Sequence, residues 1–205
     1  MSKPYPGVPA DEKRTWVVPR WLKEAFVAFA VVSVLAVAIS KGVQHFGVAG
    51  ERARSAVEAD ELDGAPATPF NLPARGGGQL DLAAFRGKPV LVNFWATWCP
   101  PCREEMPSLA RLAQSFDPQS FEVLTVSVDD GWEPIEKFLP GPRTPYRVAL
   151  DEGAKISRAY GTTKLPESYL LDRDGKLRLK FVGPRNWMDP NVATLLEQYG
   201  ARRKG

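Results

Sequence analysis

The sequence predicts an α/β domain preceded by an apolar segment. From residue 89 onward, β-type runs alternate with helical segments in the order strand, helix, strand, helix, strand, followed by a hairpin and a last helix. The chain has 205 residues, 44% of them apolar and 25% charged, which suits one globular domain with additional segments. Its net charge of +3 is too small to indicate a nucleic-acid partner.

The first elements of the domain follow from local patterns. Residues 73–78 are rich in proline and glycine and separate two short β-type runs, 70–72 and 79–82, which predicts a hairpin. The apolar run 89–94 predicts a buried strand. Residues 103–116 have helical character, so this strand leads directly into a helix.

The later elements are shorter. Residues 121–128 are rich in β-branched side chains, as in a central parallel strand. A proline near the start of 134–139 suits a short helix. We also expect a strand over 146–150, a helix over 154–160, a hairpin of 168–171 with 177–182 around the turn 172–176, and a closing helix over 190–199.

Residues 25–40 carry no charge, which predicts a transmembrane helix. Sixteen residues cover about 24 Å as a helix, so we extend the span to 25–46 to approach the roughly 30 Å of a bilayer core. Residues 1–24 then form a cytoplasmic tail, and 47–68 form a flexible linker before a domain at 69–205. More basic residues precede the run than follow it, so the domain is expected on the periplasmic or extracytoplasmic side of the cytoplasmic membrane.

Two other interpretations of this run stay open. Ala36, Val37 and Ala38 form a small-x-small site after an apolar core of suitable length, as in a cleavable secretory signal. A buried helix of a soluble protein would show a polar face, and the run shows none. Both membrane-related interpretations export the rest of the chain.

The two cysteines of the chain, Cys99 and Cys102, indicate redox chemistry. They lie where a buried strand meets a helix N-terminus, and there free backbone N–H groups and the helix dipole stabilise a thiolate. Such positions lower the pKa of a cysteine from about 8.5 to between about 3.5 and 7.5. We therefore predict that Cys99 is the attacking nucleophile and Cys102 the resolving thiol of a mixed disulfide with the substrate.

Other roles for the two cysteines fit the sequence less well. A structural zinc site needs four ligands, and the chain adds a single histidine, His45, in another region. A structural disulfide would close a loop of two residues and remove little entropy from the unfolded chain. Two unrelated buried thiols would not account for the aromatic and double-proline context of the motif, in which Pro100 and Pro101 fix the loop conformation. The sequence implies no metal ion and no organic cofactor.

The segment 90–102, Val-Leu-Val-Asn-Phe-Trp-Ala-Thr-Trp-Cys-Pro-Pro-Cys, resembles the active-site segment of the thioredoxin superfamily. The likeness is greatest to the membrane-anchored TlpA/ResA/CcmG (DsbE) branch and extends over residues 69–200. It implies a thioredoxin-like fold, in which helices flank a central mixed sheet. It also implies an N-terminal hairpin, a central βα insertion between residues 129 and 160, and one transmembrane helix before the domain.

Glu105 is the candidate proton carrier. It follows Cys102 by three residues on the same helix face, where partial burial beside a thiol would raise its pKa. The resemblance implies a functional acid at this offset. In the alternative, Glu104 and Glu105 merely complement the helix N-terminus. Asn93 stands where thioredoxin has a buried aspartate, and an amide does not relay protons, which favours Glu105 in that role.

The dipeptide Leu165–Pro166 is the second informative position. The resemblance implies that Pro166 is cis and packs against the two cysteines, and that the backbone of Leu165 pairs with the substrate. Residues 166–169 look most like the CcmG type, which acts in cytochrome c maturation. We expect Trp98 at the rim of the site, and count Pro100 and Pro101 with it as substrate contacts.

The resemblance implies a membrane-tethered thiol-disulfide oxidoreductase that reduces client proteins. The Cys-x-x-Cys-His haem-attachment motif of apocytochrome c is one expected client, and a membrane thiol-electron donor of the CcdA/DsbD type is the expected source of electrons. The direction of electron flow follows from the family alone. A disulfide-forming oxidant, a redox or metal-delivery assembly factor for respiratory oxidases, a peroxiredoxin and a non-catalytic interaction module stay open as alternatives.

Overall fold

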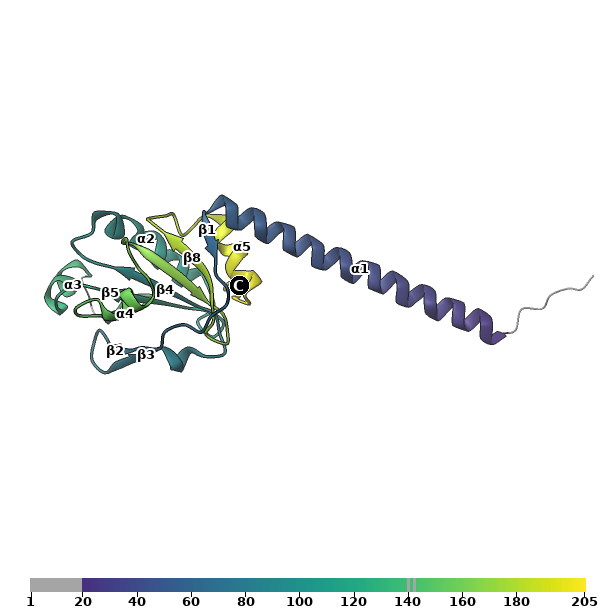
Figure 1. The fold of residues 1–205 in the computed structure, drawn as a ribbon, viewed down its shortest axis with the longest axis horizontal. Coiled ribbons are helices and arrows are strands. Elements are labelled where there is room, and N and C mark those ends of the chain that lie inside the picture. The colour runs from purple at the N-terminus through teal and green to yellow at the C-terminus, as the bar shows by residue number, and fades with distance from the viewer. Residues whose placement is uncertain (1–19, 140, 142) are drawn as a thin grey trace, which may run out of the picture. The chain divides into compact units, whose positions relative to one another are not determined.

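The computed structural model describes residues 20–139, 141 and 143–205 (Figure 1). The chain divides into two units, Met1–His45 and Phe46–Gly205. The second unit contains a six-stranded sheet of order β1-β8-β7-β4-β5-β6 and a separate two-stranded hairpin. The sheet strands are β1 Ala59–Glu61, β4 Val90–Trp95, β5 Glu122–Ser127, β6 Arg147–Leu150, β7 Glu167–Leu171 and β8 Leu177–Val182, and the hairpin is β2 Asn71–Pro73 with β3 Gln79–Asp81.

The sheet is mixed, as predicted. Strands β4, β5 and β6 run parallel, whereas β7 is antiparallel to β4, β8 to β7, and β1 to β8. The helices are α1 Arg20–Ala56, the 3-10 turn η1 Leu82–Phe85, α2 Pro100–Ser115, α3 Trp132–Phe138, α4 Lys155–Ala159 and α5 Pro190–Gln198. All the elements predicted from 70 to 199 are therefore present, with ends shifted by a few residues.

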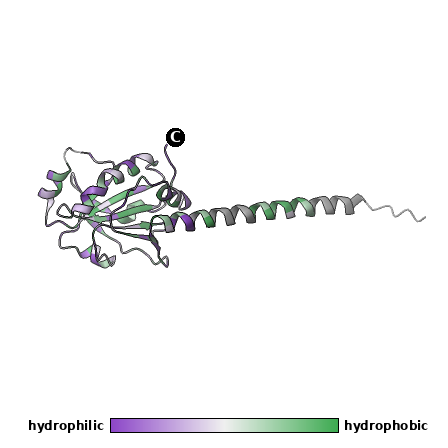
Figure 2. Cartoon of the chain, turned by 90° about the horizontal axis from the view of Figure 1, so that it is seen from above, coloured by the Kyte–Doolittle hydropathy of each residue, from purple (hydrophilic) through white to green (hydrophobic). Residues whose placement is uncertain are grey.

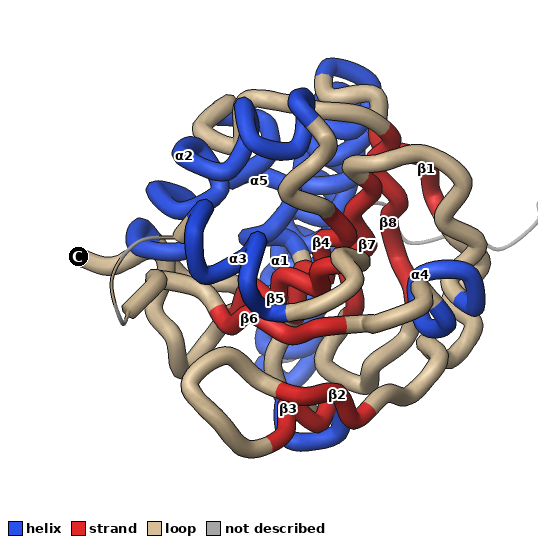
Figure 3. The backbone as a smooth tube through the Cα atoms, turned by 90° about the vertical axis from the view of Figure 1, so that its left-hand side faces the viewer, coloured by secondary structure: helices blue, strands red, loops and turns tan. Residues whose placement is uncertain are grey.

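Two hydrophobic cores lie on opposite faces of the sheet. One face packs against α2, α3 and α5, and the other against the β2–β3 hairpin, η1 and α4 (Figure 3). In β4, successive side chains alternate between the faces, so Leu91 and Trp95 belong to the first core, and Val92 and Phe94 to the second. Figure 2 shows apolar residues along these strands. This alternation directs Asn93 to the α2 face of the sheet.

Helix α2 begins immediately after the first cysteine. The Cys99 sulfur lies at the N-cap and accepts the Cys102 backbone N–H at 3.3 Å. Prolines occupy the first two helical positions, where a missing N–H costs no helical hydrogen bond. The helix then buries Met106, Leu109 and Leu112 against the sheet, which fixes its N-terminus beside the end of β4.

The segment before the domain differs from the prediction. The expected flexible linker, 47–68, is helical through Ala56 and continues into β1, which pairs with β8. Ala53 and Val57 are buried in the first core, and a bridge joins Pro66 to Lys176. The linker prediction is therefore wrong, because tertiary pairing with β8 orders a segment whose own sequence has weak strand propensity.

Two predictions concern the N-terminal unit: a cytoplasmic tail and a transmembrane helix. The expected cytoplasmic tail falls mainly on residues 1–19, which lie outside the described residues, and 20–24 are already part of α1. Along α1, large apolar side chains between Phe29 and Ile39 are exposed by 52–73%. No helix in the described part of the chain has both the length and the apolar character of a membrane span.

Candidate active site

The two cysteines form a disulfide at the junction of β4 and α2. The Cα atoms of Cys99 and Cys102 lie 5.3 Å apart. Cys102 is fully buried, and Cys99 is 6% exposed, which is less than expected for a nucleophile at a helix rim. Cys99 nevertheless lines a surface groove, whereas Cys102 does not. A partner approaching through the groove therefore meets Cys99 first.

Glu105 lies on the buried side of α2, one turn after Cys102, and is 3% exposed. Its Oε1 accepts a hydrogen bond from Asn93 Nδ2 at 2.8 Å. The same Asn93 nitrogen donates to Ser168 Oγ at 2.9 Å, since Asn93 and Ser168 are paired across β4 and β7. The other carboxyl oxygen, Oε2, accepts the Arg185 backbone N–H at 3.2 Å. These contacts hold the Glu105 carboxyl in one position beneath the motif.

Burial raises the pKa of Glu105 from 4.5 to about 7. The hydrogen bonds from Asn93 and Arg185 oppose this rise, as do the Trp187 indole and the Arg185 charge. The Trp187 indole N–H has no hydrogen-bond partner. We therefore attribute its effect on the pKa of Glu105 to the dipole of the indole N–H and not to a hydrogen bond. A carboxyl with a pKa near neutrality exists in both forms at physiological pH, so it can give or take a proton there.

The side-chain oxygen of Asn93 is an unused hydrogen-bond acceptor. Its Oδ1 is buried and has no hydrogen-bond partner, while its Nδ2 makes two hydrogen bonds. Such an amide suits the ionised form of Glu105, which only accepts. Rotation of the amide would offer Oδ1 to a protonated Glu105, so Asn93 can serve either form of the acid.

The loop before the motif is held by Asp129, which was not among the residues predicted from the sequence. Asp129 follows β5 and is 1% exposed. Its carboxylate accepts from Thr97 N at 3.0 Å, from Thr97 Oγ1 at 2.6 Å and from Ser127 Oγ at 2.6 Å. These bonds fix the backbone two residues before Cys99. A polar residue at the carboxyl end of a predicted parallel strand was the signal that the sequence offered.

The peptide bond between Leu165 and Pro166 is cis, as predicted. Pro166 is buried, and β7 begins with Glu167 directly after it. Glu167 is 1% exposed and pairs with Lys180 Nζ at 3.0 Å. It also accepts from the Tyr169 hydroxyl at 3.0 Å. The strand that begins after the cis bond therefore starts with a buried carboxyl whose cation, Lys180, is partly exposed.

A groove of about 570 Å³ opens beside Cys99. Its lining includes Trp98, Pro100 and Leu165, all three predicted as substrate contacts. Trp98 is 65% exposed, which is unusual for a tryptophan and shows that this side chain does not pack in the core. Pro101, also predicted as a contact, does not line the groove. The rest of the lining is Val128, Ala154, Ser157, Arg158, Thr162, Thr163 and Lys164.

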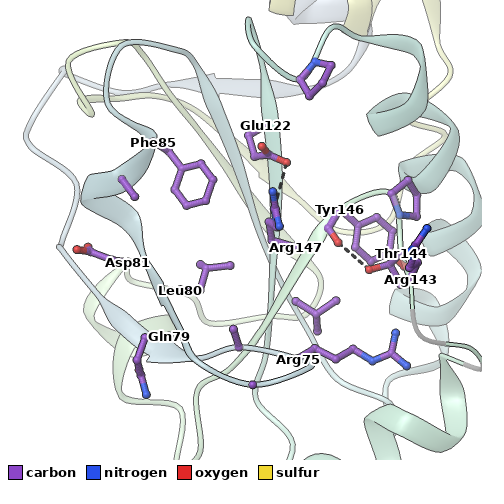
Figure 4. A pocket seen from close by; sticks show the side chains of 16 residues that line it. Arg75, Gln79, Leu80, Asp81, Phe85, Glu122, Arg143, Thr144, Tyr146 and Arg147 are labelled. Atoms are coloured by element: carbon purple, nitrogen blue, oxygen red, sulfur yellow. Dashed lines mark hydrogen bonds and ion pairs between the residues drawn. The ribbon is translucent and has the colours of Figure 1, made fainter.

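A second and larger cavity, about 640 Å³, lies between the β2–β3 hairpin and β6 (Figure 4). The labelled side chains include Leu80 and Phe85 on one side and Tyr146 on the other, with Arg147 next to Glu122. None of its lining residues is a predicted site residue, and none is a cysteine. We therefore place the candidate active site at the groove that contains Cys99. In the described part of the chain, no three His, Cys, Asp or Glu residues are grouped to hold a metal ion.

Comparison with known proteins agrees with this geometry. The family model described as "AhpC/TSA family" matches residues 64–180, more than half of the chain. The chain belongs to the AhpC/TSA family. A relative named "Thiol-disulfide oxidoreductase ResA" from Bacillus thuringiensis is 36% identical over 101 residues, which cover 49% of this chain and 58% of that protein. The protein of the same name from Bacillus subtilis is 28% identical over 155 residues, or 76% of this chain and 83% of the relative.

A solved structure of similar fold is described as a putative thiol:disulfide interchange protein DsbE from Chlorobium tepidum. It has a TM-score of 0.58 and 34% identity, and the match covers 68% of this chain and 94% of that one. The predicted relationship to ResA- and DsbE-like proteins and the predicted thioredoxin-like fold are thus confirmed. The chain spans less than two thirds of the length of the first curated relatives that it matches.

Proposed function

We propose that this chain is a thiol-disulfide oxidoreductase that passes two electrons through Cys99 and Cys102. The observation that carries the proposal is the Cys99–Cys102 disulfide at the N-terminus of α2, with Cys99 open to a groove. Its homologues named thiol-disulfide oxidoreductases support the same chemistry. The helix N-terminus stabilises a Cys99 thiolate once the disulfide is reduced.

The reaction runs as two thiolate exchanges. In the reduced protein, the Cys99 thiolate attacks one sulfur of a client disulfide, forms a mixed disulfide and releases the other client sulfur as a thiolate. Cys102 then loses its proton and attacks Cys99 Sγ, which forms the Cys99–Cys102 disulfide and releases the second client thiolate. We assign Glu105 as the base that takes the Cys102 proton, because it lies one turn away and its pKa of about 7 suits transfer near neutral pH.

For direction and client, we propose that the protein reduces the Cys-x-x-Cys-His motif of apocytochrome c outside the cytoplasmic membrane. A membrane thiol-electron donor of the CcdA/DsbD type would return the two electrons. The similarity to a protein described as DsbE and the Pro166-Glu167-Ser168 sequence at the cis bond support this assignment. A measured reduction potential near about −270 mV would favour a reductant, and one near about −120 mV would favour the oxidant alternative.

The test of the chemistry is a trapping experiment. Cys102→Ser removes the resolving thiol, so Cys99 should accumulate in mixed disulfides with client proteins that are released by a reducing agent. Cys99→Ser is the matched control, because it keeps a thiol at position 102 but removes the one in the groove. Equal trapping by both variants, or none by Cys102→Ser, contradicts the assignment of Cys99 as nucleophile.

We also propose that the N-terminal part of α1 tethers the domain to the membrane with the N-terminus in the cytoplasm. Support comes from the uncharged run 25–40, whose described large apolar side chains are exposed and need an apolar surrounding. In fractionated cells, the full chain should stay with membranes after extraction at alkaline pH. Recovery in the extract, or removal of the segment by a signal peptidase, contradicts the tether.

A further inference from the structure

The loop between β8 and α5 reaches the acid of the proposed mechanism. The Arg185 backbone N–H donates to Glu105 Oε2 at 3.2 Å, although the two residues are 80 positions apart. Two residues further on, the Trp187 backbone N–H donates to Ser108 Oγ at 3.1 Å, and Ser108 lies on α2 one turn after Glu105. The loop is therefore attached to α2 at two points on its buried face.

The Arg185 side chain holds this loop in place. Its Nη1 donates to the Val57 carbonyl oxygen, and its Nη2 to the Val182 carbonyl oxygen at 3.1 Å. Its guanidinium carbon lies 4.8 Å from the centre of the Phe181 ring and 5.6 Å from that of Trp187. Because side chain and backbone N–H belong to one residue, these contacts determine where the N–H that faces Glu105 points.

Val57 directly follows α1, and its backbone N–H donates to the Ala53 carbonyl oxygen at 3.2 Å. The chain reverses at Glu58, which has a left-handed φ of 50°, before β1 begins. Burial lowers the pKa of Arg185, and the charges of Glu105, Glu58 and Asp60 oppose this lowering. Arg185 thus binds the junction between α1 and β1 with its side chain and the Glu105 carboxyl with its backbone.

The other groups that face Glu105 carry no formal charge. Asn93 on β4 contributes its amide, and Trp187 in the loop contributes its indole. Ser168 on β7 acts only through Asn93, whose Nδ2 donates to its hydroxyl. Arg185 supplies the one charge among the described groups that acts on Glu105. Once the disulfide is reduced, the Cys102 thiol on α2 is an additional titratable neighbour.

We propose that Arg185 is a positioning residue for Glu105, and that it links this acid to the junction between α1 and β1. The proposal rests on the proposed function, in which Glu105 moves the proton of Cys102. Loss of the side chain removes a positive charge and releases the backbone N–H, and both changes disfavour the carboxylate. Glu105 should then stay protonated to higher pH, and the Cys102 thiol should lose its base at neutral pH.

The experiment is a carboxyl-carbon NMR titration of Glu105 in the full-length oxidised protein, with the signal assigned by its absence in Glu105→Gln. Arg185→Met keeps a similar stem without the charge and should raise the titration midpoint by about one pH unit, a tenfold change in the proton affinity. Arg185→Lys keeps the charge without the forked contacts, and its midpoint should rise by a smaller amount. Arg111→Met, an exposed position on α2, is the matched control and should titrate as wild type.

Activity is measured in parallel on protein whose Cys99 and Cys102 have been reduced beforehand, as the rate at which this dithiol reduces an oxidised Cys-x-x-Cys-His peptide at each pH. The alkaline shift seen by NMR should appear in this profile for Arg185→Met and not for Arg111→Met. An unchanged Glu105 midpoint in either folded Arg185 variant overturns the inference. Absence of exchange by the wild type, with the midpoint shift intact, instead contradicts the proposed function and leaves the link between Arg185 and Glu105 standing.

Discussion

Replacing Glu105 by glutamine should change the pH dependence of stability. Burial holds the pKa of Glu105 at about 7 in the folded protein, against 4.5 for the free group. Between these two pH values the folded state keeps a proton that the unfolded state has lost, so the free energy of unfolding of the wild type falls as the pH rises. Below about pH 4 both states are protonated, and this contribution disappears.

The magnitude follows from the size of the shift. A rise of about 2.5 pKa units corresponds to about 3 kcal/mol of destabilisation at pH 8, since each unit is worth about 1.4 kcal/mol. Glu105 is only 3% exposed, so screening by solvent reduces this free-energy difference little. An amide at this position would not titrate, so Glu105→Gln should gain about 3 kcal/mol relative to wild type between pH 4 and pH 8.

Urea denaturation of both oxidised proteins across this pH range measures the difference. Only the change of the difference with pH is informative, because the new amide also alters the contacts with Asn93 and with the Arg185 N–H. Glu104→Gln, at the exposed neighbouring position, is the control and should follow the wild type. Parallel stability curves for Glu105→Gln and wild type would refute the argument that burial sets the protonation of this acid.

Three further substitutions have definite expected outcomes. Trp98→Ala should raise the KM for a peptide disulfide about threefold to tenfold and leave the denaturation midpoint unchanged, since the ring is exposed in the groove. Lys180→Met should lower the free energy of unfolding by about 3 kcal/mol, because it leaves the buried Glu167 carboxylate without its cation; equal stability in urea would contradict this. Asp129→Asn should cost about 1–3 kcal/mol by the same assay, since its amide nitrogen would face the Thr97 donors, and a wild-type midpoint would show that they are dispensable.

Local patterns were enough for most of the domain. The apolar run before the motif, the prolines at the start of α2 and the turn between β7 and β8 each specify an element through neighbouring residues. Strand β1 was not predictable in this way. Its sequence, Ala59-Asp60-Glu61, has weak strand propensity, and it becomes a strand because β8 offers an unpaired edge.

The candidate site shows the same division. The sequence by itself determined the cysteine pair, its place between a strand and a helix, and the location of Glu105 on the inner side of that helix, because spacing along a helix decides which side chains share a face. Only the tertiary structure decided that Asn93, Ser168 and Arg185 surround this carboxyl, and that Asp129 holds Thr97. These partners come from separate elements that meet when the sheet forms, and such meetings leave no periodic signal in the chain.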